Sequence, residues 1–444
     1  MILSVYVHGR EVATLEDLNS FSGRLTYRPD VAPDDLVSLT MPVRREPWDW
    51  DAPLHPIFQM NLPEGYLLRV LQELFGPHIG GSPINLLSVV GRNMIGRVQV
   101  APPGADLNEP AKPVDVADLL QGDNSAEAFA ELVREHATSG VSGVVPKFLD
   151  KAQVPQVGID KKGTLFTRKH IIKGSSSHLP FVSLNEHLSM QVAAKVLPTA
   201  RTAISQDGQA LVVDRFDVDG DGLPKWGMED FCALLGMPPE NKYETTWERI
   251  AKAVRDHTPA QQRPETLRHL ATTILLTYAL RNADCHAKNV ALLYTSRQDV
   301  KVAPVYDMLT TAAYPAYVNN PPGIALGGRK TWTPGKTLQT SIASVFGVAV
   351  REQVQIVEQI GDAISEVGPA VRESIAQHAG FREIGKRMLS SWEDGLEGLR
   401  GKRTYNLGAL DLGQSFWGLS DPEVVKPERN VIGRSGLADE DPMG

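Results

Sequence analysis

Cysteine is scarce in this chain of 444 residues, and the two that it has, Cys232 and Cys285, lie far apart in the sequence. So few thiols neither require disulfides nor supply a cysteine-rich zinc site. This usage fits a protein of the reducing cytosol.

Long apolar runs are also missing, and none approaches the ~20 residues that a membrane helix requires. The opening MILSVYVHGREVATL alternates like a strand and lacks the basic segment and longer apolar core of a signal peptide. We therefore expect a cytoplasmic protein with no membrane contact.

Positive charge is in deficit, since 45 Lys and Arg stand against 53 Asp and Glu, a formal net charge of −8. This balance disfavours a nucleic-acid binder that acts alone, although a local basic face remains open. The 42% apolar and 22% charged residues are typical of a globular protein. The length predicts two or three domains.

Hydrophobic patterning divides the chain into five parts. Residues 1–105 alternate strand-like runs (LSVYVHG, GRLTYRP, LVSLTMPV, MIGRVQVAP) with one helix, EGYLLRVLQELFG, and predict a small α+β domain. Residues 106–125 are rich in Pro, Asp and Gly and predict a linker. Residues 126–225 are mostly strand-like with one helix, SLNEHLSMQVAAKVL, and 226–400 are mostly helical. Residues 401–444 predict a partly ordered tail.

An unusual polar cluster, NADCHAKN, ends a helical run whose apolar face predicts a buried helix. That face carries Leu267, Leu270, Ile274, Leu275 and Tyr278. Two strands follow the cluster, and we expect the second to end at Tyr306-Asp307. If they pair as a hairpin, Asp307 returns close to Asn289 and Asp284. Carboxylates and a carboxamide so placed suit Mg²⁺.

This set of residues has the order that phosphoryl transfer requires. Protein kinases space a catalytic Asp and a metal-binding Asn as D-x-x-x-x-N, followed by a second metal-binding Asp. Asp284 and Asn289 have that spacing, and Lys288 is placed to contact a phosphate. The spacing by itself is equally compatible with a structural loop at a helix end.

A zinc site at Cys285 and His286 is the weaker alternative, because adjacent residues rarely point at one ion. We interpret His286 as a packed histidine that braces the loop.

The strand-rich part upstream supplies the elements that a kinase needs for a nucleotide. TSGVSGVVPK offers a glycine loop without the GK[ST] ending of a P-loop. Lys173 lies at the end of a predicted strand. Ile171 and Lys173 are on one face of that strand, and Ile172 is on the other. Ser183 and Glu186 read as a capping box, which we favour over a pairing of Glu186 with the lysine. In LVVDRFDVDG, Phe216 is available to an adenine ring, while Asp214, Arg215 and Asp217 fit a salt-bridged strand exit equally well.

In this order the residues resemble the HipA serine/threonine kinases, toxins of bacterial toxin–antitoxin pairs. The segments that carry the resemblance are NLPEG, LLSVVGRNMIGRV, SGVSGVVPK, HIIKG, LNEHLSMQVAAKVL, VVDRFD, MEDFCALLGMPPENKYE, NADCHAKN and APVYDML. The resemblance implies an α+β fold, in which a small β-rich N-terminal domain precedes a two-lobed protein-kinase-like body. Residues 126–225 would form its N-lobe and 226–400 its mostly helical C-lobe.

The resemblance also implies roles for single residues, with ATP and Mg²⁺ as cofactors. Asp284 would be the catalytic base with Lys288 beside it, and Asn289 and Asp307 would hold Mg²⁺. The residues expected at the nucleotide are Lys173, Asp214, Phe216, Gly143, Val144, Lys147 and His286. The family loop S-x-x-G-x-Q-x-K is autophosphorylated at its first Ser, where this chain has Gly140, with Val145 in place of Gln. Ser139 and Ser142 are the candidate replacements.

The resemblance further implies a HipB-like helix-turn-helix antitoxin as partner, and through it an indirect association with operator DNA. Its substrate class is the aminoacyl-tRNA synthetases, glutamyl-tRNA synthetase being the best-known case, and the outcome is growth arrest and persistence. Two alternatives stay open: a small-molecule kinase, and a non-catalytic co-repressor that binds the antitoxin.

Overall fold

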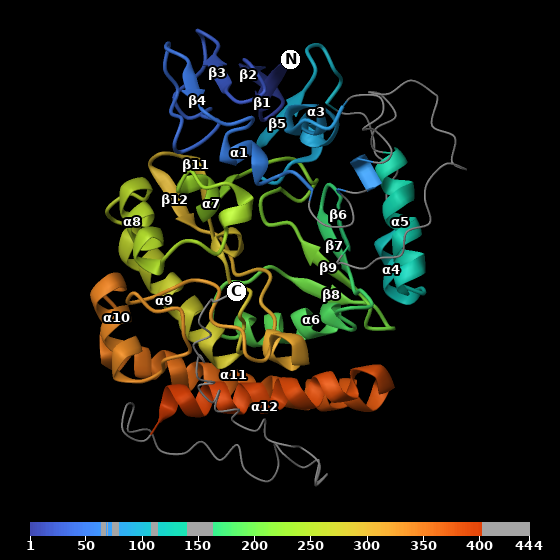
Figure 1. Cartoon of the computed structure of the whole chain (residues 1–444), viewed down its shortest axis with the longest axis vertical. Coiled ribbons are helices and arrows are strands. Elements are labelled where there is room, and N and C mark those ends of the chain that lie inside the picture. The colour runs from blue at the N-terminus through green and yellow to red at the C-terminus, as the bar shows by residue number, and fades with distance from the viewer. Residues whose placement is uncertain (64–67, 69, 73–79, 108–113, 140–162, 402–444) are drawn as a thin grey trace, which may run out of the picture. The chain divides into compact units, whose positions relative to one another are not determined.

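The computed structural model describes the chain except for residues 64–67, 69, 73–79, 108–113, 140–162 and 402–444 (Figure 1). Residues Met1–Gly408 belong to one compact unit. None of the helices in the described ranges combines the length and the hydropathy of a membrane span.

An antiparallel sheet with strand order β4-β3-β2-β1-β5 forms the N-terminal part. Its strands are β1 (Ile2–Val7), β2 (Arg10–Asp17), β3 (Gly23–Tyr27), β4 (Trp48–Trp50) and β5 (Val98–Ala101). Alternating residues of these strands, such as Leu3 and Val5, enter one apolar core, as period-2 patterning predicts. The sheet is joined by α1 (Pro56–Gln59), α3 (Pro83–Val90) and η1 (Gly91–Asn93). Gly91 is required where η1 crosses β5, because a Cβ there would lie 2.5 Å from the Val100 carbonyl oxygen.

One strand predicted in this region is wrong. LVSLTMPV forms a loop with a single bridge, Ser38 to Met41. The Tyr27 hydroxyl makes two of the hydrogen bonds that a neighbouring strand would otherwise make to this segment. It accepts from the Val37 N–H at 2.8 Å and donates to the Met41 carbonyl at 2.6 Å. Side chains that satisfy these backbone groups cannot be read from a local pattern. The predicted helix EGYLLRVLQELFG lies mostly outside the described residues.

A second antiparallel sheet, with order β6-β7-β9-β8, follows in the predicted N-lobe. Its strands are β6 (Gly163–Phe166), β7 (His170–Gly174), β8 (Thr202–Ile204) and β9 (Ala210–Asp214). The helix α6 (Val182–Ala194) is the one that the sequence predicted.

Two helices in this region were not predicted. The segment 106–125, expected as a linker, contains α4 (Val116–Gln121), and α5 (Ala126–Ser139) occupies a stretch expected to be mostly strand. Phe129 of α5 joins the core that covers the sheet, and it packs so close to β7 that a Cβ at Gly174 would lie 2.4 Å from its ring. This packing makes α5 part of the lobe.

The last part is mostly helical around a three-stranded sheet, β10-β11-β12. The strands are β10 (Gly227–Asp230), β11 (Ala291–Ser296) and β12 (Asp299–Val302). The longer helices are α8 (Trp247–His257), α9 (Arg263–Ala279), α10 (Lys336–Phe346), α11 (Val350–Gln377) and α12 (Arg382–Arg400). The short ones are α7 (Phe231–Leu234), η3 (Pro239–Asn241), η4 (Ala287–Asn289), η5 (Thr311–Ala313), η6 (Pro315–Tyr317) and η7 (Ala379–Phe381).

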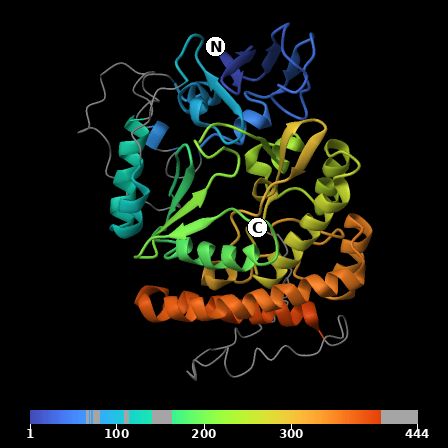
Figure 2. The ribbon, with the colours of Figure 1, turned by 180° about the vertical axis from the view of Figure 1, so that it is seen from behind.

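The buried helix predicted ahead of the polar cluster is α9, and all five residues of its apolar face are buried. The long helices α11 and α12 pack on each other and on α6 and α9, as both views of the ribbon show (Figures 1 and 2). The N-terminal sheet lies beside the β11–β12 hairpin, where Arg97 donates to the Thr295 carbonyl at 2.8 Å. The NADCHAKN loop is thus held between a buried helix and a hairpin.

Candidate active site

Lys173 reaches the site from β7. Ile172 faces the core with no exposed surface, while Ile171 and Lys173 lie on the other face, as the strand pattern predicted. The Lys173 ammonium lies 2.5 Å from Glu186 Oε1 and 2.6 Å from Asp307 Oδ1. One cation therefore joins the sheet, α6 and the segment after β12.

Glu186 does not cap α6, so the capping-box interpretation is wrong. The helix begins two residues earlier, with Phe181 as N-cap, and the Ser183 hydroxyl donates to the Lys173 carbonyl. Glu186 is fully buried, and a buried carboxylate requires a cation or hydrogen-bond donors. Lys173 supplies that cation, which is the alternative that the sequence left open.

Asp307 is turned toward Lys173 by an unusual backbone. The β11–β12 hairpin is antiparallel as predicted, but β12 ends at Val302 and not at Asp307. The chain then crosses to the preceding lobe, where the Val305 N–H donates to the Pro198 carbonyl at 2.9 Å. Asp307 itself has φ of +56°, in the left-handed region that Asp tolerates better than most residues.

Asp284 is held by the two asparagines of the motif. Its N–H donates to Asn282 Oδ1 at 3.0 Å, and Asn289 Nδ2 donates to its carbonyl at 3.1 Å. The Ala283 N–H donates to Thr311 Oγ1 at 2.7 Å. These bonds fix the backbone of the loop and leave the Asp284 side chain 41% exposed.

The Asp284 carboxylate is oriented by Tyr243, whose hydroxyl donates to Asp284 Oδ1. The Tyr243 ring packs edge-on against His286, with 5.0 Å between ring centroids. His286 is 5% exposed, and burial lowers its pKa to about 4, so the ring is neutral at pH 7. His286 therefore braces the loop by packing against Tyr243.

Asn289 and Asp307 line one small cavity together with Cys285. Both offer oxygen atoms, the ligands that Mg²⁺ prefers. In the parts of the chain that the structure describes, no three His, Cys, Asp or Glu side chains gather as a metal site. The two residues fit an ion that completes its shell with phosphates and water. Burial raises the pKa of the Cys285 thiol to about 12, whereas zinc requires a thiolate.

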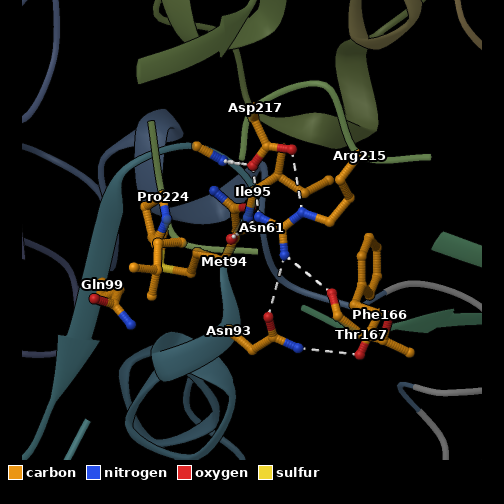
Figure 3. Close-up of polar contacts among 12 residues, drawn as sticks. Asn61, Asn93, Met94, Ile95, Gln99, Phe166, Thr167, Arg215, Asp217 and Pro224 are labelled. Atoms are coloured by element: carbon orange, nitrogen blue, oxygen red, sulfur yellow. Dashed lines mark hydrogen bonds and ion pairs between the residues drawn. The ribbon is translucent and has the colours of Figure 1, made fainter. Parts of the chain in front are cut away.

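The segment that follows β9, residues 215–217, is hydrogen-bonded to the N-terminal part of the chain (Figure 3). Arg215 and Asp217 are buried and pair at 2.5 Å. Arg215 donates to the Met94 carbonyl and to Asn93 Oδ1, and Asp217 accepts from the Gly96 N–H at 2.7 Å. The salt-bridged interpretation thus holds for these two residues, which form a clamp on residues 93–96.

The two residues expected at the adenine lie on either side of Arg215. Phe216 packs with Tyr306, 5.9 Å between ring centroids, in an apolar cluster that includes Met228. The Asp214 side chain is exposed at the end of β9. The backbone of this exit is therefore anchored on one side and adjoins an aromatic pair.

Comparison with known proteins decides the family. Residues 139–368 match the model of the HipA-like C-terminal domain, and residues 3–101 match that of the HipA N-terminal domain. The chain belongs to the HipA family. The two matched stretches leave out residues 102–138, which contain α4 and all of α5 except its last residue, Ser139.

Two relatives of this HipA-family chain come from Sinorhizobium fredii (strain NBRC 101917 / NGR234). "Putative kinase Y4mE" is 29% identical over an alignment of 305 residues, and the match covers 63% of this chain and 69% of the relative. "Putative kinase Y4dM" is 27% identical over an alignment of 339 residues, and the match covers 70% of this chain and 78% of the relative.

The Shewanella oneidensis MR-1 HipA, solved in a complex with HipB and operator DNA, has a similar structure. The TM-score is 0.66 at 18% identity, and the match covers 92% of this chain and 100% of that one. This likeness shows the predicted fold, α+β with a kinase-like body.

Some residues singled out in the HipA-like sequence lie outside the described part, namely Gly140, Ser142, Gly143, Val144, Val145 and Lys147. Ser139 is the last residue of α5. Lys288 is partly buried in η4, and its carbonyl accepts from the Tyr306 hydroxyl at 2.7 Å.

Tyr243 is the site residue that the sequence analysis missed. It stands in the block MEDFCALLGMPPENKYE, 41 residues before Asp284, and no spacing rule joins the two. The backbone contributes as well, since the Ala287 N–H donates to the Lys242 carbonyl at 3.0 Å. Only the packing of this segment on the NADCHAKN loop shows its part in the candidate site.

Proposed function

We propose that this HipA-family chain is an ATP- and Mg²⁺-dependent kinase of serine or threonine side chains in a protein. The observation that carries the proposal is the position of Lys173 between Glu186 and Asp307. Protein kinases require a strand lysine paired with a helix glutamate, and a metal-binding aspartate in place beside them. The relatives named as kinases agree with this reading.

The chain's own residues would divide the reaction among them. Asp284, oriented by Tyr243, accepts the proton of the acceptor hydroxyl. The hydroxyl oxygen forms a bond to the γ-phosphorus, and the bond from that phosphorus to the bridging oxygen breaks, so that ADP leaves. Lys173 holds the phosphates, and Asn289 and Asp307 would hold Mg²⁺. When bound, the ion neutralises charge on the phosphates.

We further propose that the kinase is the cytoplasmic toxin of a toxin–antitoxin pair, with a HipB-like helix-turn-helix protein as partner. The support is the family and the Shewanella HipA, which was solved with HipB and its operator DNA. In this proposal the chain approaches DNA through the antitoxin, which agrees with its net charge of −8. An aminoacyl-tRNA synthetase such as glutamyl-tRNA synthetase is the proposed substrate.

Labelled ATP tests the proposal. The purified chain is incubated with ATP, Mg²⁺ and a panel of aminoacyl-tRNA synthetases, and labelled proteins are identified by mass spectrometry. We expect Asp284→Asn to abolish transfer and growth arrest while ATP still binds. Asp256→Asn, an exposed aspartate on α8, is the matched control and should behave as wild type. Full growth arrest by Asp284→Asn would refute the kinase-toxin proposal.

A further inference from the structure

A pocket of about 390 Å³ opens in front of the catalytic aspartate. Asp284 lines it, together with Tyr243, Tyr314, Tyr317, Asn320 and Lys330. Lys173, Asn289 and Asp307 are not among its lining residues, and the last two line the small cavity. The Asp284 side chain therefore borders a space separate from the cavity of the proposed metal ligands. In a kinase, the group that enters such a space is the acceptor.

The walls of this pocket are held in place by backbone pairing. Residues around 325–330 run beside the start of α8, where Thr246 bridges Ala325 and the Trp247 N–H donates to the Ala325 carbonyl at 3.0 Å. Gly323 approaches the catalytic loop so closely that a Cβ there would lie 2.4 Å from the Cys285 carbonyl oxygen. The pocket is thus a built feature of the fold.

The positive charge of the pocket wall comes from Lys330. Asp284 and Lys330 are the charged residues that line it. Between Asp307 and Glu352 the sequence has no Asp or Glu, whereas the chain's average frequency would place about five there. The same segment contains Arg329, Lys330, Lys336 and Arg351. Apart from the proposed base, the charge that lines the pocket is therefore that of Lys330, which attracts an anionic group and repels a cationic one.

Lys330 is positioned to receive that anion. Its ammonium donates to the Tyr243 carbonyl at 3.1 Å and lies 5.5 Å from the centroid of the Tyr243 ring. Among the residues that the structure describes, it has no carboxylate partner. Tyr243 contacts Asp284 through its hydroxyl and Lys330 through its carbonyl. Asp284 and Lys330 therefore contact the same residue, Tyr243.

We propose that this pocket binds the acceptor segment of a protein substrate, with its serine or threonine hydroxyl at Asp284 and a neighbouring aspartate or glutamate at Lys330. The inference rests on the proposed kinase function and adds to it the substrate class, an acidic acceptor segment. Lys330 is then a specificity-determining residue.

Binding tests the inference independently of phosphate transfer. The probes are two fluorescent pools of serine-centred peptides, whose other positions are neutral and acidic in one pool and neutral and basic in the other. Affinity for the full-length chain is measured by anisotropy with a non-hydrolysable ATP analogue and Mg²⁺ present. We expect wild type to bind the acidic pool about fivefold more tightly. Lys330→Glu should reverse this order. Lys336→Glu reverses a charge in the same acid-free segment but outside the pocket lining, and should keep it.

Several results would overturn the inference. These are equal affinity for the two pools, no binding of either pool, or an unchanged order in Lys330→Glu. Tighter binding of a single-stranded RNA oligonucleotide that depends on Lys330 would assign the pocket to nucleic acid instead. If the expected order is found and no synthetase or peptide is ever phosphorylated, the acidic-segment site stands and the kinase proposal fails. If phosphate transfer occurs without a charge preference, the kinase proposal stands and this inference fails.

Discussion

Lys173 and Asp307 lie 134 residues apart in the sequence, and their side chains meet at 2.6 Å. The same ammonium also pairs with the fully buried Glu186 at 2.5 Å. Lys173 is thus shared between a carboxylate of the protein interior and one at the edge of the proposed metal site. Its removal should affect both the stability and the chemistry of the protein.

Lys173→Met should destabilise the fold because it leaves Glu186 buried without its cation, a loss of about 3–5 kcal/mol. Glu186→Gln in the same chain removes the unpaired charge, so the double variant should recover most of that loss. Urea unfolding measures the free energies. Lys173→Met and the double variant should both fail to transfer phosphate, because both lack Lys173. If the double variant lost as much free energy of unfolding as the two single variants added together, the Lys173–Glu186 pair would not be the cause of the destabilisation.

Tyr243→Phe should lower kcat about tenfold and leave KM for ATP unchanged, because it removes one hydrogen bond that orients the Asp284 carboxylate. The ring remains packed against His286, so the fold should be intact. Steady-state kinetics provide the measurement. Tyr278→Phe also loses a hydroxyl, one that donates to the Thr331 carbonyl at 3.2 Å, and serves as control. Equal effects of the two substitutions would assign Tyr243 a structural role only.

Asp217→Ala should loosen the clamp on residues 93–96. It leaves the Arg215 guanidinium, 3% exposed, without its carboxylate and the Gly96 N–H without its acceptor. Breaking a buried pair in this way costs about 3–5 kcal/mol. Amide exchange should become faster at residues 94–98. Asp219→Asn, in an exposed turn two residues further on, should leave that exchange unchanged. Unaltered exchange in Asp217→Ala would contradict the clamp.

Glu229→Gln should change how stability depends on pH. Burial raises the pKa of Glu229 from an ordinary 4.5 to about 7, where it accepts from the Leu39 N–H and the Ser38 hydroxyl. The folded state binds the proton more tightly, so stability falls as pH rises from about 4.5 to about 7, by at most about 3 kcal/mol. Glutamine cannot ionise, and this slope should disappear.

The buried histidines act in the opposite direction. Burial lowers the pKa of His286 to about 4, so the unfolded state binds the proton more tightly. The contribution of His286 to the free energy of unfolding is therefore lost as pH falls from about 6.5 to about 4. The informative quantity is therefore the difference in free energy of unfolding between wild type and Glu229→Gln at each pH. A difference that does not vary between pH 4.5 and 7 would refute the assignment to Glu229.

Strong local patterns in the sequence predicted their elements well. The period of the apolar residues predicted α6 and α9, and strand alternation predicted β1, β3, β5 and the strand β7 that carries Lys173. LVSLTMPV was wrong because the side chain of Tyr27, at the end of the preceding strand β3, satisfies its backbone. The capping box was wrong because burial beside Lys173 overrode the local preference of Glu186. In each case a tertiary contact outweighed a local propensity.

The sequence by itself determined the helices α6 and α9, the residues of α9 that face the core, and the spacing of Asp284, Asn289 and Asp307, because these depend on neighbours along the chain. The tertiary structure alone decided that Glu186 pairs with Lys173, that Tyr243 holds Asp284, and that Lys330 lines a pocket beside it. These contacts join residues from separate elements. Side chains from separate elements meet only when packing and backbone turns bring them together, and no local pattern records that meeting.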